Sequence, residues 1–179
     1  MIRAKIFQGR LRFYIAFFCL CSISTLSHSH EIKIDGKLND LSWESAEEYT
    51  KFYESFPFTL KSPTSFQKVL ILEDSDGIYF GFINQQKKEQ VRANKHERDD
   101  EMSNADKVGV SIDFDGNGLV AYSFSVSAGG SISDGIYRNE NEINYDWDAD
   151  WKSEVYIDDD FWFAEIFIPW TIAPMKSID

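Results

Sequence analysis

Aromatic and acidic residues alternate in one short segment, Tyr145–Trp151, which reads YDWDADW. Sugars bind proteins by laying their C–H faces on flat aromatic rings while their hydroxyl groups bond to polar side chains. The segment therefore predicts a carbohydrate site. A competing interpretation assigns one of its tryptophans, Trp151 at the start of a strand, to the core. The complete predicted carbohydrate site is Trp147, Tyr145, Arg98, Asp99 and Trp151.

A second set of chemically capable residues lies in Asp113–Gly118, whose sequence DFDGNG resembles the first half of a calcium loop. Hard cations such as Ca²⁺ need several oxygen ligands at short range, so Asp113, Asp115 and Asn117 are the predicted ligands of a structural Ca²⁺. The twelfth position of the loop is Phe124 rather than glutamate, which excludes an EF-hand. The same residue types also build an ordinary hairpin turn, and this plainer interpretation is preferred.

A hydrophilic stretch, Gln85–Asp106, separates two strand-like segments, and loops of this length are commonly functional. The sequence contains no nucleophile elbow, zinc-binding helix or phosphate-binding loop, so no catalytic residue is assigned. Pairs of carboxylates suited to glycoside hydrolysis arise by chance among 30 acidic residues. Any glycosidase activity is therefore expected in an associated domain. A further oxygen-rich group comprises Asp99, Asp100 and Asp106.

The segments that must position these residues are of strand type. They are short runs rich in β-branched and aromatic residues, separated by clusters of Asp, Gly, Ser and Asn. Only Leu41–Tyr49 is predicted to be helical, and Trp43 and Trp162 are assigned to the core. The pattern predicts an all-β fold, an antiparallel β-sandwich of immunoglobulin or jelly-roll type with one or two short helices. The predicted strands are Phe66–Glu73, Gly77–Asn84, Lys107–Phe114, Leu119–Ser127, Lys152–Ile157 and Phe161–Ile168.

Two of these strands separate an apolar face from a small, polar one. In Lys107–Phe114 the valine, isoleucine and phenylalanine residues share one face, whereas glycine, serine and aspartate share the other. In Leu119–Ser127 an aromatic face likewise opposes one of alanine and serines, and a hairpin through Asp115–Gly118 would join the two strands. The polar face either meets water, which is the commoner arrangement, or forms a shallow floor for a ligand.

The first 29 residues differ in kind from the rest. They hold four basic residues and no acid, followed by an apolar run, Phe13–Leu26, that is too short to span a bilayer comfortably. Small residues precede His30, so residues 1–29 are predicted to be a signal peptide that carries away both cysteines. Residues 30–179 then form one domain in the periplasm, at the outer membrane or outside a Gram-negative bacterium. The net charge of −12 argues against nucleic acid as a partner.

The segment Ile34–Trp43, which reads IDGKLNDLSW, resembles the opening signature of carbohydrate-binding module family 9-like domains. Asn39-Asp40 stands where that signature has two acids. The resemblance covers nearly the whole of residues 30–179, and the ordered series of motifs is more specific than any one of them. Its further motifs are Gly77–Phe82, Asp106–Asp113, Ala121–Gly130, Trp147–Trp151 and Trp162–Pro169.

The resemblance implies a β-sandwich, binding of a polysaccharide or oligosaccharide, and a link to polysaccharide breakdown. It also implies a structural calcium and a tryptophan clamp, of which Trp147 is the candidate member. Similar exported proteins continue into a C-terminal outer-membrane β-barrel, which is the expected missing domain of this chain. Two alternatives remain: a structural periplasmic or lumenal domain of such a barrel protein that binds no sugar, and a haem-binding sandwich that uses His96 and Met102.

Overall fold

The structure is a computed structural model that describes residues 32–100, 103–138 and 142–173. The predicted signal peptide, residues 1–29, and Met102 of the haem alternative lie outside the described residues. Among the residues that are described, no helix combines the length and the apolar character needed to cross a membrane.

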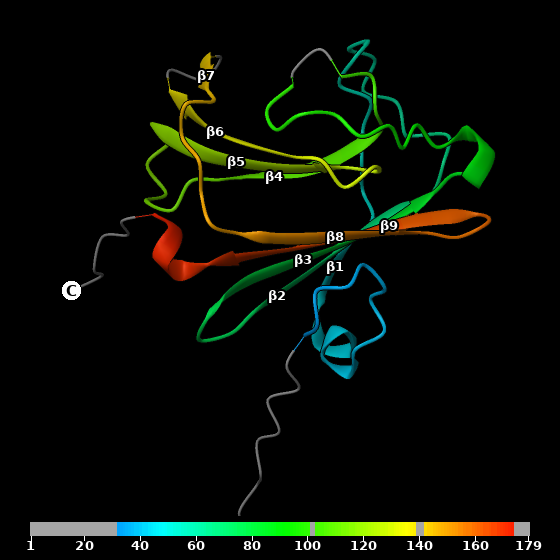
Figure 1. Cartoon of the computed structure of the whole chain (residues 1–179), viewed down its shortest axis with the longest axis horizontal. Coiled ribbons are helices and arrows are strands. Elements are labelled where there is room, and N and C mark those ends of the chain that lie inside the picture. The colour runs from blue at the N-terminus through cyan, green and yellow to red at the C-terminus, as the bar shows by residue number, and fades with distance from the viewer. Residues whose placement is uncertain (1–31, 101–102, 139–141, 174–179) are drawn as a thin grey trace, which may run out of the picture.

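Two antiparallel sheets pack face to face, which confirms the predicted β-sandwich (Figure 1). The five-stranded sheet has the order β1-β2-β3-β9-β8, and the four-stranded sheet has the order β4-β5-β6-β7. The five-stranded sheet comprises β1 (Glu47–Tyr49), β2 (Gln67–Glu73), β3 (Gly77–Gln85), β8 (Lys152–Ile157) and β9 (Phe161–Pro169). The four-stranded sheet comprises β4 (Lys107–Ile112), β5 (Val120–Ser127), β6 (Ile132–Arg138) and β7 (Glu142–Asn144). The 3-10 helices are η1 (Leu41–Ser45), η2 (Lys88–Gln90) and η3 (Trp170–Ile172).

All six predicted strands are present. They pair as three hairpins, β2 with β3, β8 with β9, and β4 with β5, the last through the predicted turn Asp115–Gly118. The predicted helix Leu41–Tyr49 is wrong in its second half. Only Leu41–Ser45 is helical, and Glu47–Tyr49 instead pairs with β2. The three residues of β1 are all exposed at the edge of the sheet, so they lack the apolar alternation that identifies a strand. Pairing with a strand distant in the sequence overrides their local preference.

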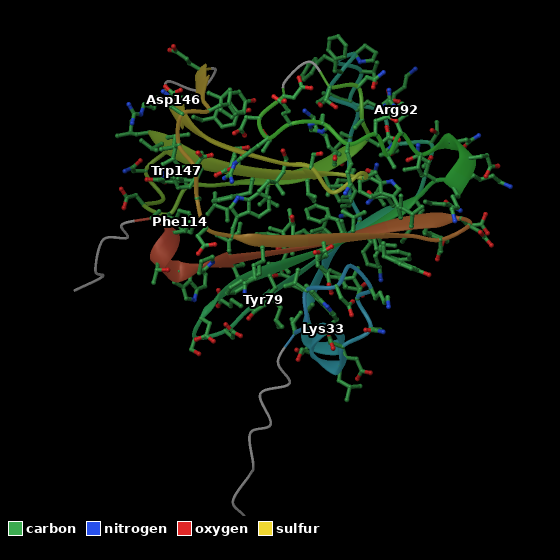
Figure 2. The ribbon with its side chains drawn as sticks, in the orientation of Figure 1. Lys33, Tyr79, Arg92, Phe114, Asp146 and Trp147 are labelled. Carbon is green, nitrogen blue, oxygen red and sulfur yellow. The ribbon has the colours of Figure 1, made fainter. Side chains whose placement is uncertain are left out.

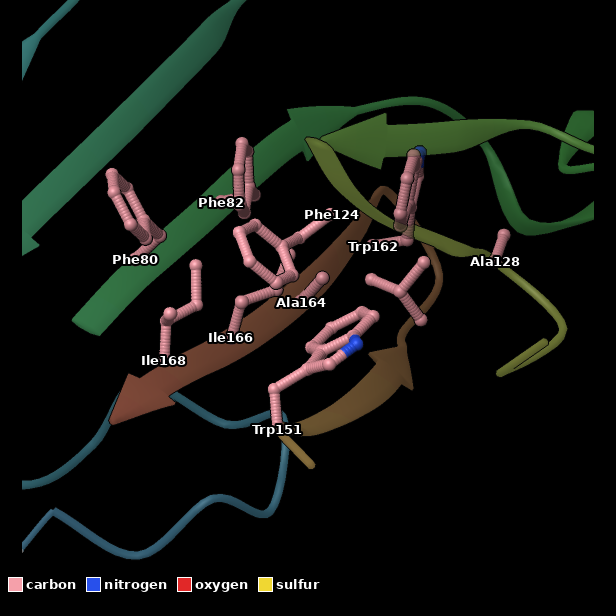
Figure 3. Close-up of a cluster of buried hydrophobic side chains, with 10 residues drawn as sticks. Phe80, Phe82, Phe124, Ala128, Trp151, Trp162, Ala164, Ile166 and Ile168 are labelled. Carbon is pink, nitrogen blue, oxygen red and sulfur yellow. The ribbon is translucent and has the colours of Figure 1, made fainter. Parts of the chain in front are cut away.

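The core lies between the two sheets, where aromatic and aliphatic side chains interdigitate (Figure 3). Phe124 of β5 is completely buried and meets β9, whose inward face includes Trp162 and Ile166. The aromatic face predicted for β5 is therefore the core face. Burial of apolar area on this scale is the main stabilising contribution to such a fold.

The segment before β1 covers the outer face of the five-stranded sheet and is fixed there by one carboxylate, that of Glu165 on β9. One oxygen of Glu165 accepts backbone N–H bonds from Asp35 and Gly36, both at 2.7 Å. The other accepts bonds from the Leu38 backbone at 3.3 Å and from the Trp43 indole at 3.1 Å. The Glu165 side chain is fully buried, and every one of these donors is neutral.

This contact gives a structural reason for two motifs of the sequence. Burial raises the pKa of Glu165 above its ordinary value, and the four N–H donors offset part of that effect. Gly36 has a φ of +81°, which glycine adopts at little cost. The IDG…W segment and the glutamate of β9 therefore form a clasp that closes the N-terminal segment on the sheet, and the predicted core position of Trp43 is confirmed.

Candidate functional site

Both predicted sugar-binding tryptophans pack in or against the core. Trp151 is 7% exposed, and its ring meets Phe124 edge-on at a centroid distance of 5.6 Å. Trp147 is half-buried and packs edge-on against Tyr122 at 5.0 Å and against Phe124 at 5.9 Å (Figure 2). The competing interpretation of Trp151 as a core residue is confirmed, and Trp147 extends the same aromatic cluster.

The alternation in the segment Tyr145–Trp151 records which side chains face inward. Its aromatic residues and Ala149 are buried or half-buried, whereas the intervening Asp146, Asp148 and Asp150 are exposed. An extended chain with one face on a core shows this period of two. The pattern that predicts a sugar site from residue types is therefore also the ordinary pattern of a segment that lies on a core.

Arg98 is held by the protein itself at the centre of an acidic cluster. Its guanidinium forms a short hydrogen bond with Asp134 and a bond of 2.9 Å between Nε and the carboxylate of Asp148. The carboxylate of Asp99 lies 3.6 Å from the same Nε and accepts the Asp134 backbone N–H at 2.9 Å. The structure thus brings Arg98 and Asp99 together beside the aromatic segment. There they tie the long loop to β6.

Asp134, which the sequence analysis missed, is the buried member of this cluster. It is 1% exposed and lies opposite Phe124 on the inner face of the sheet. Burial raises its pKa, although bonds from the Ala149 backbone and Arg98 lower it in part. The available signal was an acid flanked by isoleucines at alternate positions of a strand. The carboxylates of Asp99, Asp134 and Asp148 converge closely enough to hold a cation, and the guanidinium of Arg98 fills that role.

The predicted calcium ligands lie in the turn between β4 and β5, where they close the turn. The carboxylate of Asp113 accepts backbone N–H bonds from Gly118 at 2.6 Å, Gly116 at 2.9 Å and Asp115 at 3.1 Å. These bonds, with that from Gly118 first, hold its pKa below the ordinary value. Asn117 bonds in the same way to the backbone two residues further on. The preferred turn interpretation accounts for these oxygens, and calcium stays a prediction.

A groove of about 1000 Å³ opens between the edge strand β4 and the strands β2 and β3 of the opposing sheet. We call it the edge groove. Phe52 and Phe56 from the segment before β2 line it, together with polar residues of the long loop (Figure 2, near Arg92). Phe56 is 96% exposed, so its ring is open to a ligand. Its polar lining includes Gln86, Gln90, Arg92 and Lys107.

Hydrogen bonds fix the polar wall of the edge groove. The amide of Gln86 accepts the Trp162 indole N–H at 3.1 Å and donates to Asp106 at 2.8 Å. Arg92 donates from Nε to the other oxygen of Asp106 at 2.9 Å. Burial would raise the pKa of Asp106, but the bonds from Arg92 and Gln86 outweigh it, so the net pKa is lowered. This wall is therefore held in one arrangement before any ligand arrives.

A second hollow of about 240 Å³ lies on the outer face of the four-stranded sheet. Its floor is a set of serines on β5 and β6, so we call it the serine trough. Tyr137 of β6 and Tyr145 line it. The polar face that the sequence assigns either to water or to a ligand floor therefore lies in a hollow, and one predicted site residue, Tyr145, borders it. The serines that line it are Ser103, Ser123, Ser125, Ser127, Ser131 and Ser133.

The two hollows meet at β4, since Lys107, Val108 and Gly109 line both of them. Together they form one surface that runs from the edge of the sandwich onto the outer face of the sheet. Lys107 lies at the junction, is exposed, and has no ion-pair partner in the part of the chain that the structure describes.

His96 borders the serine trough, and its surroundings bear on the haem alternative. Its Nδ1 lies 2.9 Å from the Glu97 carbonyl oxygen, an acceptor for the tautomer that carries its proton on Nδ1. The other ring nitrogen, Nε2, is the atom left to bind an iron, and it is buried.

No family model, curated protein or solved structure matches the chain.

Proposed function

We propose that the chain is an exported, non-catalytic carbohydrate-binding domain that serves polysaccharide breakdown, and that sugar contacts the surface formed by the edge groove and the serine trough. One observation carries this proposal: two hollows that meet at β4 bring hydroxyl, amide and aromatic side chains onto one continuous surface. An elongated surface of this kind is better suited to binding a polymer than to binding a compact ligand.

The chemistry of the lining supports a sugar. Hydroxyl and amide groups both donate and accept hydrogen bonds, as the hydroxyls of a sugar do. The side-chain oxygens of Ser123 and Ser133 form no hydrogen bond within the described residues, and both line the trough. Tyr137 and Tyr145 supply aromatic faces in the trough, and Phe56 supplies one in the groove.

Two features of the sequence support this proposal: the predicted signal peptide and the similarity to family 9-like modules. A signal peptide in residues 1–29 delivers the domain to the periplasm or cell surface, where polysaccharides are met. The series of motifs similar to family 9-like modules agrees with a sandwich that binds sugar. The proposal moves the sugar contact away from Trp147 and Trp151, because those rings face the core.

The test is electrophoresis of the purified chain through native gels that contain xylan, β-glucan, galactan, alginate or polygalacturonate. We expect retardation by at least one polysaccharide. Tyr137→Ala should weaken that binding about tenfold, which corresponds to about 1.4 kcal/mol of lost stacking. Tyr156→Ala is the matched control, since Tyr156 is an exposed tyrosine on the outer face of the other sheet.

Migration unaffected by every polysaccharide would overturn the proposal. Equal binding by Tyr137→Ala and the unaltered chain would remove the serine trough from the site.

A further inference from the structure

The charge of the edge groove is opposite to that of the chain. The chain has 18 basic and 30 acidic residues and a net charge of −12. The groove is lined by Lys68, Arg92 and Lys107 and by one acid, Asp106. A positive groove in an acidic protein focuses attraction for anions at that place, because the surrounding surface repels them.

These three cations differ in how far the protein neutralises them. Lys68 pairs with Glu48 at 2.9 Å, and Arg92 is held by Asp106. Lys107 has no ion pair among the described residues. It therefore offers a full positive charge at the point where the groove passes into the trough.

We propose that this surface selects an acidic saccharide, with the ammonium group of Lys107 pairing with the carboxylate of a uronic acid ring. The inference rests on the proposed function and names its ligand class. A charge-assisted bond to a carboxylate is stronger than a bond between neutral groups, so one such contact favours an acidic sugar over a neutral one. The rest of the acidic surface repels a polyanion that does not place its charge there.

The neighbouring side chains explain why a sugar acid fits better than other anions. The amide of Gln90 lies on the groove side of Lys107, and the serine floor lies on its other side. The neighbouring Gln86 amide is held by the protein, since it donates to Asp106 and to the Gln90 carbonyl oxygen. Amide and hydroxyl side chains both form hydrogen bonds with the hydroxyl groups of a sugar. The trough itself contains an acid, Asp100, so the positive character belongs to the groove and the junction. The acidic group of the ligand is thus expected at β4, with neutral ring hydroxyls over the serines.

The experiment is calorimetric titration of the full chain with oligosaccharides from polygalacturonate and alginate, with neutral galactan and xylan oligosaccharides, and with poly-L-glutamate. We expect the uronate oligosaccharides to bind at least tenfold more tightly than the neutral ones, and poly-L-glutamate to bind no more tightly than the neutral sugars.

Lys107→Gln is expected to weaken uronate binding about tenfold and so to bring the uronate and neutral affinities close to each other. Lys152→Gln is the matched control, because Lys152 and Lys107 each begin a six-residue strand with the same alternation of exposed and half-buried residues.

Each other outcome overturns a defined part of the account. Tighter binding of neutral sugars would refute the acidic ligand class and leave the proposed function standing, whereas binding of no sugar would refute both. Equal binding of poly-L-glutamate would show attraction for carboxylates without recognition of sugar. Unchanged uronate binding by Lys107→Gln would refute the role of Lys107.

Discussion

The aromatic–acid segment, Tyr145–Trp151, and the surface across β4 contain similar residue types, but the protein's own contacts engage the first more completely than the second. In the first region, Trp151 packs on Phe124 and Arg98 is shared by three carboxylates. In the second, the hydroxyls of Ser123 and the ammonium group of Lys107 lack such partners among the described residues.

The difference shows that residue type alone does not identify a binding site. A tryptophan or arginine contributes to binding only if its face or its hydrogen-bond donors remain free after folding. Both regions combine aromatic and polar groups, yet the first uses them to join the long loop to β6. The predictions below test this division between a structural region and a binding surface.

The largest expected effect comes from Trp151→Ala. The free energy of unfolding should fall by about 4 kcal/mol, because a large buried ring is replaced by a cavity. Urea denaturation followed by circular dichroism measures the loss. Phe58→Ala is the control, since Phe58 is 79% exposed, and its effect should stay within about 0.5 kcal/mol. A small loss of stability together with a lost affinity for sugar would return Trp151 to the binding site.

A smaller effect distinguishes the two regions: one carboxylate from each should contribute to the free energy of unfolding, and the two contributions should have opposite dependence on pH. Asp134 has a raised pKa, so the folded chain takes up its proton at higher pH than the unfolded chain does. Its stabilising contribution is therefore present at low pH and is lost as the pH rises through the folded pKa. Asp106 has a lowered pKa, so its contribution is present above the unfolded value of 3.8 and is lost as the pH falls.

Urea denaturation from pH 7 down to about pH 2.5 measures both contributions, because the Asp106 contribution is lost only below the unfolded value of 3.8. As the pH falls, the unaltered chain should gain stability relative to Asp134→Asn and lose stability relative to Asp106→Asn. Two slopes of the same sign would contradict the assignment of the buried and the ion-paired carboxylates.

The sequence was sufficient to predict the sandwich because most of its strands have a recognisable local pattern of alternating residues bounded by turns. β5 alternates aromatic and small residues, and Asp-rich turns set it off from its neighbours. β6 was missed because Asp134 and Gly135 interrupt its apolar pattern. The buried acid is compensated by the Ala149 backbone N–H and by the salt bridge to Arg98, 36 residues away. Contacts so distant in the sequence leave no local pattern.

The candidate site was predicted less well for a related reason. The polar face of β4 and β5 was foreseen from the alternation alone, and Tyr145 lies beside it. The edge groove was not foreseen, because it forms only where β4 approaches β2 and β3. Those two strands precede β4 in the sequence and are separated from it by the long loop. Residues such as Gln86 and Lys107 have ordinary types for exposed positions and carry no signal before the sheets pack.

The most direct test is a two-dimensional NMR titration of the amide resonances of the chain with oligogalacturonate. The account predicts that the largest shift changes map to Lys107–Ile112, Ser123–Ser127 and Gln86–Arg92, along the groove and the trough. Changes confined to Asp146–Trp151 would contradict it and place the sugar on the aromatic–acid segment.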